Sequence, residues 1–247
     1  MADYRREIRF GYFLVPYARD PLLETAREVE LRGLDYVAVQ DHPYQRRYVD
    51  TWTLLSMIGG STEAIEAYGG PRREPGAALA ALAEAIEVIR LVWSGTRNLR
   101  FDGAHYRLAG AQSGPVPAHP IGIWLGVYGP RALRLAGRVA DGWIPSLRGE
   151  LPPLRDMAAR LDDAAAEAGR DPGAIRRVLN VSGAITDGAA EGLFNGPVEH
   201  WVEQLTELAV RDGFDTFILA ADAPGQLARF AEEVVPAVRS SVVDARW

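Results

Sequence analysis

Short, continuous apolar runs recur along the chain, and each is followed by a longer stretch with helical periodicity. The first run, IRFGYFLV at 8–15, ends at Pro16. The helix after it begins at Asp20-Pro21, an N-cap residue followed by proline in the first helical position, and ends before Gly33. Strands that are apolar throughout are typical of parallel sheets covered on both faces. The pattern therefore predicts a parallel α/β protein.

One phrase, in which a helix leads through glycine and aspartate into a strand, occurs repeatedly. It reads LRGLDYVAVQD at 31–41 and VRDGFDTFILAAD at 210–222, with the variant AGRVADGWIPS at 136–146. Repeated short connections of this kind are typical of βα units. Asp35 and Asp215 precede their strands, and we interpret both as structural residues.

The full pattern predicts six strands, near 8–15, 36–40, 121–126, 141–145, 178–185 and 216–220. Helices are predicted near 21–32, 51–57, 76–94, 130–139, 153–169, 197–212 and 224–239. The helix at 76–94 has no strand before it, and FDGAHYRL at 101–108 predicts a small hairpin. Six units fit a doubly wound sheet, or an eight-stranded (β/α) barrel that lacks two strands.

Composition narrows the chemistry. The chain has 247 residues, no cysteine and no lysine, since all 27 basic residues are arginine. Thiolate nucleophiles, Schiff-base and pyridoxal-phosphate enzymes and the P-loop lysine are therefore excluded. The four histidines are dispersed, and no metal or hydrolase motif is present. An enzyme of this composition would depend on a bound cofactor for its reactivity.

The net charge and the hydropathy of the chain indicate which classes of partner it can have. The net charge of -6 argues against a nucleic-acid partner. The N-terminus is charged and no apolar run approaches the roughly 20 residues of a membrane helix. We expect a soluble, cytoplasmic protein with neither nucleic-acid nor membrane partners.

Asp41 and His42 follow the second predicted strand. Ligands of parallel α/β folds gather at the carboxyl ends of the strands, so this position favours a functional role. There, His42 could act as an acid or base near neutral pH, and Asp41 could orient it or accept a cofactor hydrogen bond. The alternative is that Asp41 caps a turn that Pro43 enforces, and that His42 is merely polar.

A second candidate lies where the strand near 121–126 passes into a helix. Gly126 ends the strand, and Gly129 and Pro130 begin the helix, with Arg131 in its first turn. Free N–H groups at a helix N-terminus bind anions, and arginine would add positive charge for a phosphate. The stretch is not GxGxxG, so it does not predict a classical dinucleotide site. An ordinary strand–helix turn is the alternative.

The chain resembles the bacterial-luciferase-like superfamily of flavin- and deazaflavin-dependent oxidoreductases over nearly its whole length. The matching pieces include DHPY at 41–44, AIEAYGGPRREPG at 64–76 and GPRALRLAGRVADGW at 129–143. The resemblance implies a single TIM-barrel domain over 1–247, a (β/α)₈ barrel with an insertion that holds FMN or the deazaflavin coenzyme F420. It also implies cofactor contacts from Asp41, His42, Gly126, Gly129, Pro130 and Arg131. In deazaflavin members the histidine matching His42 is a proposed proton donor or acceptor.

The sequence departs from that family between Ile58 and Gly59, where two βα units, strands 3 and 4, are absent. Roughly 50–60 residues would be needed to encode them. Either the sequence omits a segment or the protein lacks it. An opened barrel would expose two strand edges, which favours omission. An intact mass clearly above 27.0 kDa would support this hypothesis, and a mass of 27.0 kDa would contradict it.

The resemblance implies an oxidoreductase or monooxygenase acting on a small organic substrate, by hydride transfer with F420 or by oxygenation with FMN. A non-catalytic flavin-binding or relic barrel is the alternative, and it gains weight if the two units are truly absent. A homodimer is compatible with either.

Overall fold

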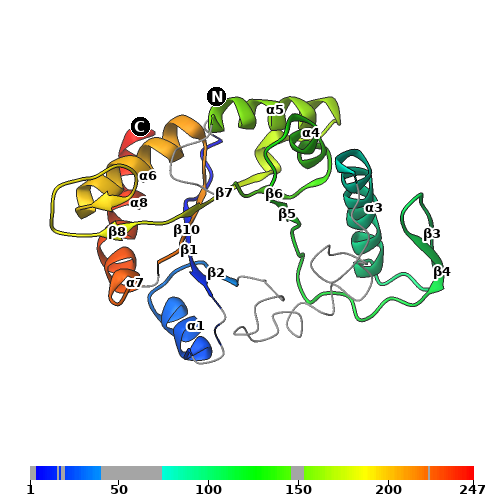
Figure 1. Ribbon diagram of the computed structural model, residues 1–247, viewed down its shortest axis with the longest axis horizontal. Coiled ribbons are helices and arrows are strands. Elements are labelled where there is room, and N and C mark those ends of the chain that lie inside the picture. The colour runs from blue at the N-terminus through cyan, green and yellow to red at the C-terminus, as the bar shows by residue number, and fades with distance from the viewer. Residues whose placement is uncertain (1–3, 16, 18–19, 40–73, 146–152, 222) are drawn as a thin grey trace. The chain divides into compact units, whose positions relative to one another are not determined.

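The computed structural model describes residues 4–15, 17, 20–39, 74–145, 153–221 and 223–247 (Figure 1). Its contacts divide the chain into two compact units, residues 1–40 with 124–247 and residues 41–123. The expectation of a single domain over 1–247 stays a prediction.

The first unit contains a six-stranded, wholly parallel sheet of strand order β2-β1-β10-β7-β6-β5. Its strands are β1 (Arg9–Leu14), β2 (Tyr36–Val39), β5 (Trp124–Leu125), β6 (Gly142–Trp143), β7 (Arg176–Val181) and β10 (Thr216–Leu219). Among the described residues, this is the order of an eight-stranded barrel without the two strands that would stand between β2 and β5. The six predicted strands are confirmed, with one difference at the end of β7.

The strand predicted at 178–185 does not continue to residue 185. β7 ends at Val181, and β8 (Ala184–Ile185) instead pairs in parallel with β9 (Asn195–Gly196). At Gly183 the chain passes against the backbone of Phe194, whose carbonyl oxygen would lie 1.8 Å from a Cβ atom on residue 183. Glycine at this position permits the close approach, and the chain leaves the main sheet here.

Helices in this unit start close to the predicted positions, with two differences: the N-cap of the first is Pro21 rather than Asp20, and the last continues to Ala245 instead of ending near 239. The helix predicted near 51–57 lies outside the described residues. The described helices of this unit are α1 (Leu22–Leu31), α4 (Pro130–Val139), α5 (Leu154–Glu167), a 3₁₀ turn (Pro172–Ala174), α6 (Val198–Asp212), α7 (Gln226–Arg229) and α8 (Val235–Ala245). A π-helical turn over Phe230–Val234 joins α7 to α8. Pro236 follows this turn, and proline, which lacks an N–H group and crowds the preceding turn, accounts for the widening.

One face of the sheet packs against helices through buried aromatic rings. The ring of Phe10 in β1 lies 6.0 Å from that of Phe217 in β10 and 5.8 Å from that of Phe230. Trp201 of α6 meets Phe230 edge-on at 6.0 Å. All four side chains are fully buried. Because each aromatic side chain removes a large apolar area from water, this cluster is a main source of stability for the unit.

The amino ends of the strands are fastened by the two aspartates interpreted as structural. Asp35 Oδ2 accepts a hydrogen bond of 2.8 Å from the Phe10 amide. Asp215, almost fully buried, accepts from the guanidinium groups of Arg6 and Arg176 and from the Arg177 amide. These bonds link β1 and β7 to the segments that precede β1, β2 and β10. They lie at the amino ends of the strands, the side of a barrel whose residues usually serve stability rather than catalysis. The structural interpretation is confirmed.

The second unit contains α3 (Pro75–Trp93) and an antiparallel hairpin of β3 (Leu99–Asp102) and β4 (Arg107–Ala111). The Glu84 carboxylate on α3 accepts from the amides of Ala104, His105 and Tyr106, at 3.0, 2.8 and 3.0 Å. The hairpin loop is thereby fixed to α3. Among the helices that the structure describes, none combines the length and apolarity needed to cross a membrane.

Candidate cofactor site at the carboxyl ends of the strands

All six strands of the main sheet are parallel, so their carboxyl ends meet along one rim. The segments that follow the strands there begin at Val15, Gly126, Ile144, Ser182 and Ala220. Asp41 and His42, which come after β2 in the sequence, lie outside the described residues. Their roles therefore stay predictions.

The face of the sheet opposite the buried aromatic cluster is called here the inner face. Side chains alternate along a strand, so Gly11, between Phe10 and Tyr12, belongs to this face. In the register of the sheet, Gly11 is opposite Ile218 of β10, which is opposite Asn180 of β7. These three residues form one row across the inner face.

Asn180 and Ser182 are inner-face residues that the sequence reasoning missed. The Oδ1 atom of Asn180 is buried and has no hydrogen-bond partner among the residues that the structure describes, although most buried polar atoms in proteins have one. Ser182, two residues later, is exposed at the rim. A signal was present, because the polar side chains at 180 and 182 alternate with the apolar residues Leu179 and Val181 in the second half of this segment.

The loop between β5 and α4 is held in place by β6. The indole Nε1 of Trp143 donates to the Val127 carbonyl at 2.9 Å, and the Ile144 amide donates to the Leu125 carbonyl at 3.1 Å. A Cβ atom on Gly126 would lie 3.3 Å from the Ile144 carbonyl oxygen, so glycine relieves a tight contact at this point. The loop presents Gly126 to solvent at the rim.

Helix α4 begins at the rim without a side-chain cap. Gly129 is its N-cap, with φ -69° and ψ 149°, and Pro130 occupies the first turn. The Leu133 amide bonds the Gly129 carbonyl at 2.9 Å, whereas the amides of Arg131 and Ala132 precede the first possible intrahelical bond. Gly129, Pro130 and Arg131 are exposed, and a Cβ atom at Gly129 would meet nothing within 4 Å.

This arrangement fits the anionic end of a cofactor. Free amides and the positive end of the helix dipole attract a phosphate, and the open space at Gly129 allows it to approach the backbone. Arg131 adds a formal positive charge in the same turn. Gly126, Gly129, Pro130 and Arg131 are thus together at the rim, and their contact with a cofactor stays a prediction.

A rigid loop, residues 183–196, follows β7 at the same rim. The side-chain amide of Gln226 bonds Ile185 twice, accepting from its N–H at 2.6 Å and donating to its carbonyl at 3.1 Å. Gln204 of α6 accepts from the Phe194 amide at 2.8 Å and donates to the Gly192 carbonyl at 3.2 Å. The clamps hold Phe194 at a positive φ of 52°. They come from later helices, so local sequence did not reveal them.

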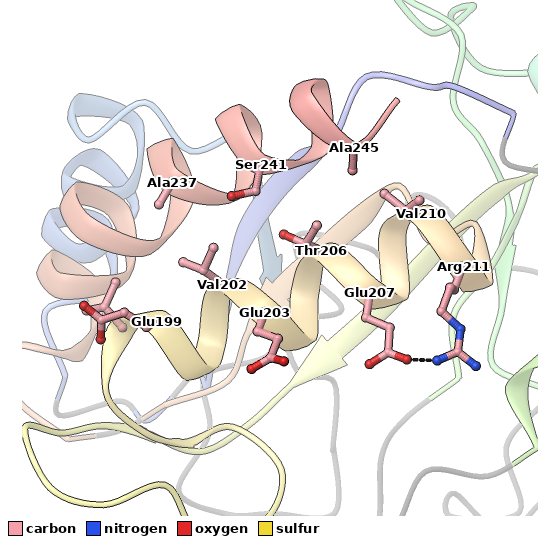
Figure 2. Close-up of a pocket in the computed structure, with 11 residues that line it drawn as sticks. Glu199, Val202, Glu203, Thr206, Glu207, Val210, Arg211, Ala237, Ser241 and Ala245 are labelled. Carbon is pink, nitrogen blue, oxygen red and sulfur yellow. Dashed lines mark hydrogen bonds and ion pairs between the residues drawn. The ribbon is translucent and has the colours of Figure 1, made fainter. Parts of the chain in front are cut away.

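A separate groove of about 660 Å³ runs between α6 and α8 on the helical side of the unit (Figure 2). Val202, Val210 and Ala237 are among its apolar lining residues, and Glu199, Glu203 and Glu207 project along α6 beside it. The carboxylate row would repel an anionic cofactor. The groove also contains no strand end, so the rim is the better candidate. Among the described residues no group of three metal-ligating side chains occurs.

The chain is similar to known proteins in sequence. The model of the luciferase-like monooxygenase family matches residues 64–193, more than half of the chain. An F420-dependent glucose-6-phosphate dehydrogenase from Nocardia farcinica is 34% identical over 131 residues, 51% of this chain and 39% of that protein. The corresponding enzyme from Nakamurella multipartita is 42% identical over 96 residues, 34% of this chain and 28% of that protein. The chain thus spans well under half the length of these curated relatives.

Solved structures confirm the fold. An F420-dependent secondary alcohol dehydrogenase in complex with an F420–acetone adduct superposes with a TM-score of 0.77 at 16% identity, covering 94% of this chain and 99% of that one. A long-chain alkane monooxygenase gives a TM-score of 0.75 at 13% identity, over 95% and 92% of the two chains. At such identities these two matches establish the architecture alone, that of a TIM barrel. Together with the matched family model, they show that this chain belongs to the luciferase-like monooxygenase family.

Proposed function

We propose that the chain is a flavin- or deazaflavin-dependent oxidoreductase that acts on a small organic substrate at the carboxyl rim of its sheet. The observation that carries the proposal is the uncapped N-terminus of α4, presented at that rim by a glycine loop and accompanied by Arg131. The lack of cysteine and lysine is compatible with it, since thiolate and Schiff-base chemistry are excluded and a bound cofactor would supply the redox reactivity.

In this proposal, the chain's own residues bind the cofactor and orient the groups that react. Gly126 and Gly129 leave room for the cofactor's phosphate, the first amides of α4 donate to it, and Arg131 neutralises its charge. F420 or FMN, when bound, supplies hydride transfer or oxygen activation. His42 holds or moves the proton that accompanies the redox step, and Asp41 fixes the orientation of the His42 ring.

The location of the protein and its partners are part of the same proposal. We place the enzyme in the cytoplasm, without nucleic-acid or membrane partners, which the net charge of -6 supports. A homodimer is compatible with this proposal.

A non-catalytic cofactor-binding barrel is the second candidate. The observation that favours it is that β2 and β5 are the two edges of the sheet, with no strand between them among the described residues. In a complete barrel, two βα units there would contribute loops to the rim. Such a barrel would keep the anion site on α4 and lose part of the substrate pocket.

Fluorescence-quench titration with F420, and with FMN in parallel, tests the proposal. Saturable binding of either one supports the cofactor site, and binding of neither contradicts it. For a catalytic protein, His42→Ala should lower turnover far more than cofactor affinity. Equal turnover in the variant would contradict the proton-transfer role and leave the second candidate.

A further inference from the structure

The last four residues of β7 include one polar side chain, that of Asn180. Val178, Leu179 and Val181 around it are fully buried, whereas Asn180 is half-buried. Val178 is the inner-face neighbour of Asn180 on the same strand, since side chains alternate between the two faces. Access to the inner face along β7 therefore begins at Asn180, one residue before the strand ends at the carboxyl rim.

The amide of Asn180 is costly where it lies. Its Oδ1 atom is buried, and no residue that the structure describes donates to it. The neighbours in its row cannot do so, because Gly11 has no side chain and the side chain of Ile218 is apolar. An apolar residue of similar size would avoid the cost of a buried oxygen without a partner. Stability of the strand therefore does not explain an asparagine at this position.

The side-chain amide has two ends of different chemistry, a carbonyl oxygen that accepts hydrogen bonds and an NH₂ group that donates them. Because no described residue holds Oδ1, a half-turn about the Cβ–Cγ bond can exchange the two ends. Either end can thus be directed to the open side of the inner face. Such a group is complementary to a ligand oxygen that accepts, as in a carbonyl, or donates, as in a hydroxyl.

The inner face next to Asn180 is neutral in the part of the chain that the structure describes. Toward the rim, the next inner-face residues of β1, β10 and β7 are Phe13, Ala220 and Ser182, none of them charged. The Ala220 amide donates to the Val181 carbonyl at 2.8 Å, so β10 and β7 stay side by side to this level. A charged ligand group would be desolvated here without a counter-charge from these side chains. The surface therefore favours an uncharged ligand.

We propose that Asn180 is a specificity-determining residue whose side-chain amide hydrogen-bonds a carbonyl or hydroxyl oxygen of an uncharged organic substrate. This inference rests on the proposed function and narrows its substrate to a neutral, oxygen-bearing compound. A hydrogen bond between neutral groups changes affinity by about 2- to 13-fold. Asn180→Leu, which keeps the branched shape and removes both polar ends, should weaken binding of such a compound by that factor.

The first measurement is thermal unfolding without any ligand. Asn180→Leu should be at least as stable as the wild type, because it removes the oxygen that lacks a partner. Asn180→Val, with a smaller side chain, guards against overpacking. The matched control is Asn195→Leu, because both ends of Asn195 are used: Oδ1 accepts from the Ala184 amide and Nδ2 donates to the Leu193 carbonyl, each at 3.0 Å.

The control variant should lower Tm by at least about 2 °C, since it loses both hydrogen bonds. A similar fall in both Asn180→Leu and Asn180→Val would show that the amide serves the fold, and it would overturn the inference.

The second measurement observes the contact by NMR. The side-chain NH₂ signals of Asn180 are identified by their absence in Asn180→Leu. The probes cyclohexanone and cyclohexanol should shift these signals, whereas cyclohexanecarboxylate, with the same ring and a charge, should not. The Kd of the two neutral probes should rise about 2- to 13-fold in Asn180→Leu and stay unchanged in Asn195→Leu. Equal affinities in the wild type and Asn180→Leu would overturn the inference.

Titrations with F420 and FMN on the same samples separate this inference from the proposed function. If neither coenzyme binds while the neutral probes shift the Asn180 signals, the proposed function fails and the Asn180 contact stands. If a coenzyme binds and the probes leave these signals unmoved, the proposed function stands and the Asn180 contact is overturned.

Discussion

The rings of Tyr36 and Trp124 lie edge to face, with centroids 5.7 Å apart and planes at 80°. The two residues come from β2 and β5, which are the two edge strands of the six-stranded sheet. In a flat sheet these edges would be about 24 Å apart, since neighbouring strands are spaced by about 4.8 Å. Two side chains cannot span that gap and still touch. The sheet must therefore curl so that its edges approach each other at the amino ends.

Further contacts hold this pair in place. Arg9 Nη1 donates to the Tyr36 hydroxyl at 2.8 Å, and the hydrogen bond raises the pKa of the Arg9 side chain. A Cβ atom on Gly142 would lie 2.5 Å from the Trp124 ring, so glycine gives the indole its space. The side chains fill part of the amino end of the inner face, where strands 3 and 4 of a complete barrel would otherwise contribute.

A double-mutant cycle should detect this contact. We expect Tyr36→Leu and Trp124→Leu each to lower the free energy of unfolding, with a coupling of about 0.5–1.5 kcal/mol between them, the range for an edge-to-face pair. Urea unfolding of the two single variants and the double variant measures it. Tyr36→Phe is the control, because it removes only the hydroxyl bond and keeps the ring. Strict additivity would show that the edges do not meet in solution.

Helix α4 packs against α5 through Gly137. A Cβ atom there would lie 2.4 Å from the Leu161 carbonyl oxygen, which belongs to the backbone and cannot rotate away. We expect Gly137→Ala to cost about 1–3 kcal/mol of unfolding free energy, the usual penalty for overpacking. Gly129→Ala is the control, since a Cβ atom there meets nothing and φ is negative. Equal stability of the two variants in chemical denaturation would contradict this packing.

Asp215 is the centre of the charged cluster at the amino ends. Its buried carboxylate bonds Arg6 and Arg176, with the Arg176 contact at 3.2 Å. Asp215→Asn keeps the volume and removes the charge, so two arginines lose their counter-ion. We expect a loss of about 3–5 kcal/mol, as for other broken buried pairs. Asp187→Asn, at an exposed ion pair with Arg229, should cost under about 1 kcal/mol. Thermal unfolding of both variants distinguishes the cases.

Local patterns predicted the parts of the fold that depend on near neighbours in the chain. Gly129-Pro130 and the following periodicity marked α4 correctly, because caps and amphipathic faces are properties of consecutive residues. The extension of the β7 strand to residue 185 was wrong, because the chain leaves the sheet where Gly183 meets Phe194 eleven residues later. The Tyr36–Trp124 contact depends on the curl of six strands, and no window of sequence contains both residues.

The candidate site likewise contains residues that the sequence predicted and residues that it did not. The glycines and Arg131 at the start of α4 were readable from a strand–turn–helix pattern. Asn180 was missed because its significance lies in a register that only the assembled sheet reveals, namely its row with Gly11 and Ile218. The clamps from Gln204 and Gln226 are contributed by helices that follow the loop they hold.

The bond between Glu84 and the hairpin loop makes one contact of the second unit dependent on pH. Burial raises the pKa of this carboxyl group, but hydrogen bonds from the amides of His105, Tyr106 and Ala104 outweigh that effect, and the pKa falls below 4.5. A depressed pKa stabilises the folded state above the unfolded value, and the contribution is lost as pH falls through the folded value. The contact should therefore hold at neutral pH and weaken as the pH falls through the lowered pKa of Glu84.

Comparison of the wild type with Glu84→Gln over pH 3–7 tests this dependence. Glutamine keeps one acceptor oxygen and loses the charge, so the wild type should be more stable at neutral pH, and the difference should shrink as Glu84 becomes protonated. Hydrogen exchange at the amides of His105 and Tyr106 reports the contact directly, and it should be faster in the variant at neutral pH. Exposed Glu87 on the same helix provides the control, Glu87→Gln, which should leave hydrogen exchange at the hairpin amides unchanged. A stability difference that stayed constant across this range would mean that the charge of Glu84 does not hold the hairpin.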